Sequence, residues 1–307
     1  MPQTPTRFAS VSLAAIACIA FFASLTPAPA TAWCRASDEQ GADGECIDNP
    51  QLPFLFWKRS CTTYRFNVDF FDQFEMLSEN QIRSSFNAAF KAWAAVDCDG
   101  RQPFLVQQLK STTQTAKSEY LRDKPNEMVI LALERQAWSQ LPDHSPRALA
   151  LTLMWHNKKT GEILDTDMEV NLGAGTFADC VANSCMHGEL DFQNTITHEA
   201  GHVLGLGHSK DNSATMAAQT VGEVDTQKRT LTADDEDGYC ALGLPASKCT
   251  GTSCSCSEER TPEALSTPLR NTAGCQITRP AESSASWAWI AVALACLLPL
   301  RRRVLRR

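Results

Sequence analysis

The sequence contains neither a glycine-rich phosphate loop nor an internal repeat. These two absences argue against a phosphate-loop nucleotide-binding enzyme and against a solenoid built from repeats. Basic residues are also few, with 28 Lys and Arg against 35 Asp and Glu. Six of the 28 are Arg7 and the five arginines of the last seven residues, so the rest of the chain has 22 basic against 35 acidic residues, a net charge of −13. This deficit disfavours nucleic acid as a partner, because a phosphate backbone attracts surplus positive charge.

Long apolar runs are confined to the two ends of the chain. At the N-terminus, Arg7 precedes an apolar run that leads into the small-residue sequence PAPATA. This order is typical of a signal peptide over residues 1–32, with cleavage after Ala30 or Ala32, and it predicts an exported protein. A lipoprotein signal fits less well, because a bulky tryptophan precedes Cys34.

The second apolar run lies at the C-terminus. Residues 246–285 form a linker rich in Thr, Ser and Pro that also contains cysteines, and residues 286–307 hold WAWIAVALACLLPL followed by RRRVLRR. About 16 apolar or small residues are short for a membrane span of about 20, and the arginines favour the cytoplasmic side. With Gly274 and Cys275 upstream, the pattern resembles the MYXO-CTERM sorting tags of bacterial surface proteins. That resemblance implies processing at Cys275 and attachment to the cell envelope, and the alternative is an ordinary single-span tail anchor.

Cysteine is abundant, with 13 residues. Cys18 and Cys296 lie in the two apolar segments, which leaves an odd number. We expect Cys275 to stay unpaired, whereas up to five disulfides outside the reducing cytoplasm can form among ten others: Cys34, Cys46, Cys61, Cys98, Cys180, Cys185, Cys240, Cys249, Cys254 and Cys256. A second metal site at the sequence CSC, residues 254–256, is the weaker alternative because no partner pair has finger-like spacing.

Histidine is scarce, and three of the six histidines fall within the sequence HEAGHVLGLGH. The spacing of four places His198 and His202 on one face of a helix. Gly205 can adopt a left-handed conformation and end that helix, so that His208 returns as a third ligand. Three neutral imidazoles leave one position of a zinc ion open, as in catalytic rather than structural zinc sites. Glu199 then lies next to the open position as the general base for an attacking water.

The pattern HExxHxxGxxH resembles that of the metzincin metallopeptidases. Ser209, directly after the third histidine, narrows the resemblance to the matrixin branch. Met216 follows His208 by eight residues, the spacing of the methionine turn that forms an apolar floor under the zinc in that family. The resemblance covers about residues 61–245, and it implies a zinc-dependent endopeptidase that acts on extended polypeptides.

Two features depart from the matrixin pattern. Ala217 and Ala218 stand where matrixins usually have Tyr and Pro, which help to form the pocket for a substrate side chain. The sequence also lacks PRCGxPD, the cysteine switch by which many matrixin precursors cap their zinc. The side-chain preference and the latency mechanism therefore do not follow from the resemblance.

Residues 61–245 have the size of one domain, after an N-terminal cysteine-containing segment at 33–60. Three runs, 104–109, 127–133 and 148–155, have the length and composition of strands. The resemblance implies an α+β, metzincin-like fold. In that fold a mixed, mostly parallel twisted sheet carries two helices on one side, and a small C-terminal subdomain follows the zinc motif. It also makes 148–155 the edge strand above the cleft, where a peptide can add as a further strand.

Two helices outside the zinc motif have clear start signals. Ser78 can cap the first, whose buried face repeats at intervals of three and four residues: Ile82, Phe86, Ala89, Phe90 and Trp93. Thr232 and Asp235 have the spacing of a capping pair for the last helix, which then runs toward Cys240.

Other polar residues allow a second metal, either a structural Ca²⁺ or a second Zn²⁺. The candidate ligands are His156, His187, Asp165, Asp167 and Glu169. The sequence DTDMEVN alternates as a strand does, so its acids can equally form a solvated strand face. Cys180 and Cys185 either pair with each other or pair elsewhere.

The sequence therefore predicts a secreted or envelope-anchored zinc endopeptidase with polypeptide substrates and no nucleic-acid partner. The alternative is a surface module that binds zinc and peptides without cutting them.

Overall fold

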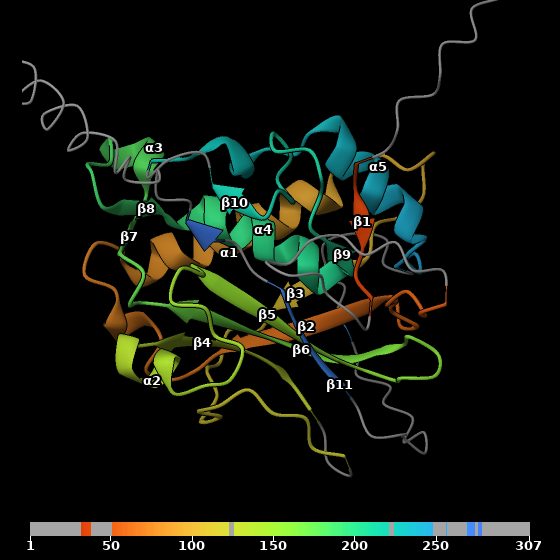
Figure 1. Ribbon diagram of the computed structural model, residues 1–307, viewed down its shortest axis with the longest axis horizontal. Coiled ribbons are helices and arrows are strands. Elements are labelled where there is room, and N and C mark those ends of the chain that lie inside the picture. Colours follow the sequence, from red (N-terminus) through yellow and green to blue (C-terminus); the bar gives the residue numbers. More distant parts are fainter. Residues whose placement is uncertain are drawn as a thin grey trace, which may run out of the picture. The chain divides into compact units, whose positions relative to one another are not determined.

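The computed structural model describes residues 32–37, 51–122, 126–220, 224–247, 256, 269–273 and 276–277 (Figure 1). The predicted signal peptide up to residue 31, the sorting tag at 286–307 and most of the linker lie outside the described residues. No helix within the described ranges is both long enough and apolar enough to cross a membrane.

A six-stranded sheet forms the base of the molecule, and its strand order is β11-β5-β6-β4-β2-β3. Its strands are β2 (Cys61–Phe66), β3 (Leu105–Gln108), β4 (Met128–Leu133), β5 (Ala150–His156), β6 (Ile163–Asn171) and β11 (Leu269–Ala273). β2 runs parallel to β3 and β4, and β4 runs parallel to β6. β5 is antiparallel to both of its neighbours, β6 and β11. The three predicted strands are thus present in a mixed, mostly parallel sheet.

The two faces of β5 contact different cores, because successive side chains point to opposite sides of a strand. Leu151, Leu153 and Trp155 pack with Trp138 on one face of the sheet. Met154 points to the other face and joins the main core. Every residue of β5 is buried, which explains why its sequence is a nearly continuous apolar run rather than an alternating one.

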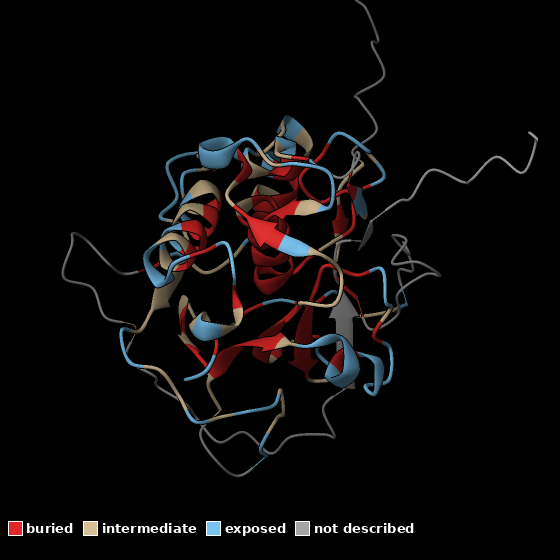
Figure 2. Ribbon diagram, turned by 90° about the vertical axis from the view of Figure 1, so that its left-hand side faces the viewer, coloured by how far each residue is buried: buried red, intermediate tan, exposed pale blue. Residues whose placement is uncertain are grey.

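Two helices, α1 (Glu79–Ala94) and α4 (Phe192–Leu204), lie together on one side of the sheet (Figures 1 and 2). Ser78 caps the start of α1, as predicted, and Gln81 completes a capping box with it. The five predicted core residues of α1 are all buried. Trp93 joins the two helices directly, because its indole Nε1 donates a hydrogen bond of 2.9 Å to the Thr197 carbonyl in α4.

The remaining elements are short. The helices are α2 (Arg135–Ser139), α3 (Cys180–Asn183) and α5 (Ala233–Leu242), with 3-10 turns η2 (Phe71–Gln73) and η3 (Gln227–Arg229). Three two-stranded pairs join β1 (Cys34–Arg35) to β9 (Leu206–Gly207), β7 (Thr176–Ala178) to β8 (Glu189–Asp191), and β10 (Gln219–Thr220) to β12 (Gln276–Ile277). Thr232 and Asp235 form the predicted capping box of α5.

The disulfides Cys61–Cys256 and Cys98–Cys240 join distant parts of the chain, whereas Cys180–Cys185 closes a short loop. Cys34 is disulfide-bonded as well. The Cys98–Cys240 bond links the loop after α1 to α5 across 142 residues. Closing a loop of that length contributes up to about 5 kcal/mol to the free energy of unfolding. Because Cys256 is bonded to Cys61, its sulfur does not take part in a zinc site at 254–256; Cys46, Cys249, Cys254 and Cys275 lie outside the described residues.

The prediction that residues 148–155 form the edge strand is wrong for this sheet. β11 lies beyond β5 and pairs with it in register from Leu269 opposite His156 to Ala273 opposite Thr152. The resemblance could not predict this pairing, because β11 comes from the C-terminal linker, which follows the family-like region. The outer hydrogen-bonding edge of β5 is therefore occupied by the chain itself.

The aromatic face of α1 should dominate the stability of the domain. Phe86 is fully buried and packs against Tyr64, Phe66 and Phe192. We expect Phe86→Ala to lower the free energy of unfolding by about 3–5 kcal/mol, because it removes buried area and leaves a cavity. Urea denaturation with the disulfides intact measures this difference. Asn87→Ala, at the exposed neighbouring position, is the control and should change stability by less than about 0.5 kcal/mol.

Candidate metal centre

Helix α4 places the first two predicted ligands. Asp191 caps its start by accepting a hydrogen bond of 2.7 Å from the Asn194 amide. The helix then carries His198 and His202 one turn apart and ends at Gly205, whose φ of +108° lies in the left-handed region. This conformation costs glycine little, and it turns the chain back sharply after the last helical turn.

His208 follows that turn, and the structure brings all three predicted histidines together. The Nε2 atom of His202 lies 3.1 Å from Nε2 of His198 and 3.3 Å from Nε2 of His208. The Nδ1 atoms of His198 and His202 point the other way, toward the carbonyl oxygens of Thr215 at 2.6 Å and Leu206 at 2.8 Å. A carbonyl only accepts hydrogen bonds, so Nδ1 of each of these two imidazoles carries the proton.

This tautomer directs the Nε2 lone pairs of His198 and His202 toward the shared centre. Three converging imidazole nitrogens are a donor set that suits zinc, and the carbonyls behind two of them fix the ring orientations. Within the described part of the chain, these histidines are the only group of three or more His, Cys, Asp or Glu residues arranged to hold one ion.

Burial keeps two of the three histidines, His198 and His202, neutral. His198 and His202 are completely buried, and desolvation is the main reason that the pKa of each lies well below its usual range. Positive charge on Lys228 and on the neighbouring histidines lowers the pKa of His198 further. Neutral imidazole is the form that binds a metal ion, so the site does not have to lose a proton first.

The structure gives no support to a second metal among the described residues. Glu169 binds His144 instead, with Oε2 2.5 Å from Nε2. Asp167 accepts a hydrogen bond from the Val129 amide, and burial followed by repulsion from Asp165 raises its pKa well above the usual range. These contacts belong to the interior of the sheet, and neither the acids of β6 nor His156 and His187 contribute to a group of three ligands.

Glu199 lies next to the ligands in sequence and is itself fully buried. Its carboxylate Oε2 accepts a hydrogen bond of 2.7 Å from the Thr152 hydroxyl on β5. This contact links the sheet to the metal centre and fixes the orientation of the carboxylate. Thr152 was not among the residues predicted for the site, since no local pattern links a threonine in an apolar strand to a glutamate 47 residues later.

Met216 lies next to Thr215, whose carbonyl faces the His198 ring, and is almost completely buried. Its side chain packs against Gly201 of α4, where an added Cβ would collide with the Met216 sulfur and with the Trp93 ring. The Met216 carbonyl also accepts a hydrogen bond of 2.8 Å from the Ser209 amide, just after His208. The turn therefore supports the ligands from below and contributes no ligand itself.

Asp235 holds this turn in place. Its buried carboxylate accepts hydrogen bonds from the amides of Thr215 at 2.8 Å and Met216 at 2.9 Å, and from the amide and hydroxyl of Thr232 at 2.8 Å each. The sequence predicted the bonds to Thr232 from their spacing. It did not predict the bonds to the methionine turn, because those residues lie 19 and 20 positions away.

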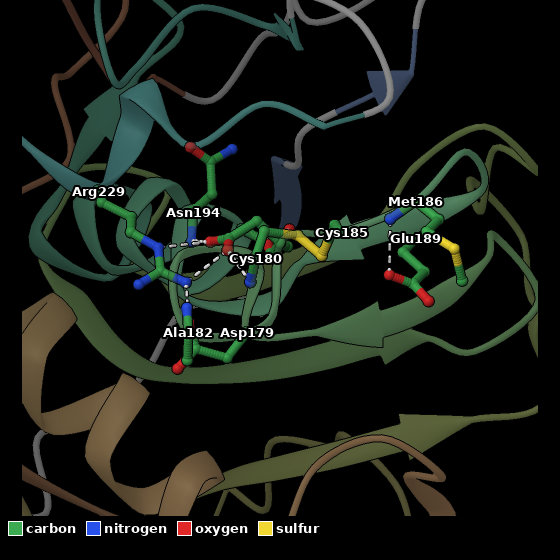
Figure 3. Close-up of a disulfide and its surroundings, with 10 residues drawn as sticks. Asp179, Cys180, Ala182, Cys185, Met186, Glu189, Asn194 and Arg229 are labelled. Atoms are coloured by element: carbon green, nitrogen blue, oxygen red, sulfur yellow. Dashed lines mark hydrogen bonds and ion pairs between the residues drawn. A yellow bond between two sulfur atoms is a disulfide. The ribbon is translucent and has the colours of Figure 1, made fainter.

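A partly buried group of one guanidinium and two carboxylates supports the other end of α4. The Arg229 guanidinium binds Asp191, the capping residue, with Nε 2.8 Å from Oδ1, and binds Asp179 with NH2 2.6 Å from Oδ1. Cys180 and Cys185 pair with each other. Figure 3 shows that Arg229 and Asp179 lie near this disulfide, close to the start of α4. The charge-assisted bonds and the disulfide hold the start of α4 in place.

A comparison with known families agrees with this geometry. The family model described as Matrixin matches residues 56–242, which include all three histidines, Glu199 and Met216. No curated protein matches the chain.

The contacts of Asp235 predict an effect on metal binding. Asp235→Asn replaces one acceptor oxygen by a donor that faces backbone amides, so the turn that supports His198 should loosen. We expect zinc affinity to fall about 10–100-fold, as is usual when a partner behind a ligand is lost. Competition with a fluorescent chelator measures the affinity, and Asp237→Asn, at an exposed position on α5, is the control. Equal zinc affinity in the two variants would contradict this role of Asp235.

Proposed function

Because the chain belongs to the matrixin family, whose members are zinc metallopeptidases, we propose that it is an endopeptidase that hydrolyses peptide bonds of extended polypeptides. His198, His202 and His208 would hold the zinc ion, and Glu199 would act as general base and then general acid. The observation that carries the proposal is the convergence of three imidazole nitrogens next to an oriented, buried carboxylate.

A zinc ion bound by the three histidines would supply Lewis-acid chemistry at its open position. The protein itself has to move protons. The Glu199 carboxylate takes a proton from the attacking water and returns it to the leaving amine, so the same residue serves both halves of the reaction. Thr152 holds Oε2 by a hydrogen bond from its hydroxyl, which keeps the carboxylate in one orientation while the proton moves.

Strand β5 supports a polypeptide as the substrate. An extended peptide can hydrogen-bond to the outer edge of a strand through backbone groups alone, which accommodates varied sequences. β11 demonstrates that β5 accepts such a partner, since the two pair over five residues. Thr152 lies in the paired stretch of β5, so a peptide added there would run past Glu199.

We also propose that the protein works outside the cytoplasm and is attached to the cell envelope. The disulfides support export, because such bonds form and persist in oxidising compartments. The proposed anchoring rests on the sequence of residues 274–307, of which the structure describes only Gln276–Ile277. Mass spectrometry of the native protein, with Cys275→Ser as the altered variant, tests whether the tail is removed or a lipid is attached there.

The roles of ligand and base predict different outcomes for two substitutions. Glu199→Ala should retain one zinc per chain but lower kcat on a denatured protein by at least about 100-fold, the usual contribution of a general base. His202→Ala should lose the zinc as well. Metal analysis and proteolysis assays with and without a chelator measure both effects, with Glu236→Ala on the exposed face of α5 as control. Undiminished turnover by a zinc-loaded Glu199→Ala protein would contradict the mechanism. If the wild-type protein binds zinc and peptides without cutting them, it is a binding module rather than a peptidase.

Thr152 should act by positioning Glu199. Thr152→Val keeps the shape of the side chain but removes the hydrogen bond to Oε2, so we expect kcat to fall about 10-fold, equivalent to about 1.4 kcal/mol, with little change in zinc content. The control is Thr166→Val on neighbouring β6, since the Thr166 hydroxyl is buried and makes no hydrogen bond within the described residues. A Thr152→Val protein with wild-type kcat would show that the contact is only structural.

A further inference from the structure

The C-terminal linker reaches the candidate active site through strand β11. Its five residues, Leu269–Ala273, pair antiparallel with β5 from His156 to Thr152. Neighbouring strands lie about 4.8 Å apart, so Ala273 places the backbone of β11 directly beside Thr152. The Thr152 hydroxyl in turn binds the Glu199 carboxylate. The linker therefore runs along β5 up to the residue that orients the general base.

The same linker also pairs with the opposite side of the site. Strand β12, Gln276–Ile277, runs parallel to β10, with Gln276 opposite Gln219 and Ile277 opposite Thr220. β10 begins three residues after Met216, whose turn supports the ligands. Two stretches of one short segment thus pair with two separate elements that flank the histidines.

We propose that residues 269–273 and 276–277, which we term the internal strand, keep the enzyme latent: residues 269–273 occupy the peptide-binding edge of β5, and residues 276–277 hold the segment to β10. This inference rests on the proposed function of the site. A strand has one hydrogen-bonding row on each side, and β6 already fills the other side of β5. While the internal strand is paired, no substrate can add at the same edge. The chain lacks the cysteine switch of related precursors, and the internal strand supplies a different means of blocking the site.

A disulfide keeps the internal strand close to this edge. Cys256 is bonded to Cys61 at the start of β2, and Leu269 follows Cys256 by 13 residues. A flexible chain of that length has a root-mean-square span of about 20 Å and can reach about 45 Å when extended. The effective concentration of a partner on so short a tether is about millimolar. A separate polypeptide must compete with that concentration to pair with the same edge of β5.

Backbone pairing makes the inference testable by a double substitution in the full chain. Alternate residues of an antiparallel strand direct their N–H groups toward the neighbour, and proline has no N–H. Asn271→Pro with Thr272→Pro therefore removes one ladder hydrogen bond to β5 whichever residue donates it. Asn271→Ala with Thr272→Ala is the matched control, because it removes the same side chains and keeps both N–H groups.

We expect the double-proline variant to cleave a fluorogenic peptide with kcat/KM at least about 10-fold above wild type, and the double-alanine variant to match wild type. A synthetic peptide of residues 267–279 should inhibit the double-proline variant competitively. Amide hydrogen exchange at residues 152–154 of β5 gives a readout without catalysis. In a Glu199→Ala background, protection there should be lost with the prolines and kept with the alanines.

The possible outcomes separate the two proposals. Two results would overturn the proposal that the internal strand blocks the site. One is the same kcat/KM for wild type and the double-proline variant, and the other is unchanged protection of the β5 amides from hydrogen exchange. Cleavage of the chain within residues 269–277 that depends on Glu199 also overturns it, since the segment is then a substrate. Loss of protection on β5 without turnover by any zinc-loaded variant supports the strand's placement and overturns the proposed peptidase function instead.

Discussion

The geometry of the metal centre depends on one buried carboxylate. Asp235 accepts hydrogen bonds from two consecutive amides of the methionine turn and from both polar groups of the residue that caps α5. The carbonyl of Thr215, in the same turn, orients the His198 ring. A single side chain thus fixes the last helix, the floor of the site and one ligand relative to each other. A buried carboxylate without these donors would be strongly destabilising, so the three parts must form together.

The features that could be predicted from the sequence are those whose interacting residues lie close together along the chain. The histidine spacing, the left-handed Gly205, the cap at Ser78 and the capping pair of Thr232 and Asp235 involve residues within about ten positions of one another, and the structure contains all of them. Thr152 and the second role of Asp235 depend on contacts between distant segments, which a local pattern does not encode. The prediction that β5 is an edge strand was wrong for a related reason. A strand pairs through its backbone, so almost any linker sequence can add to it.

Covalent bonds, an ion-pair network and hydrogen bonds restrain helix α4 and the elements next to it. Arg229 and the Cys180–Cys185 bond support the start of α4, and Cys98–Cys240 ties the end of α1 to α5 behind the site. Trp93 and Trp57 donate hydrogen bonds to carbonyls of Thr197 and Val203 within the helix. The helix that carries two ligands is therefore restrained at its ends and along its length, as a preorganised site requires.

Gly201 limits how this helix can change in evolution. The position lies between the two ligands that α4 provides, where the zinc motif by itself permits any residue. Here the Trp93 ring and the Met216 sulfur occupy the space that a Cβ would need. Residues 93, 201 and 216 form one steric unit, so a side chain at position 201 requires smaller or displaced neighbours on two other segments. We expect these three positions to covary among relatives that share this fold.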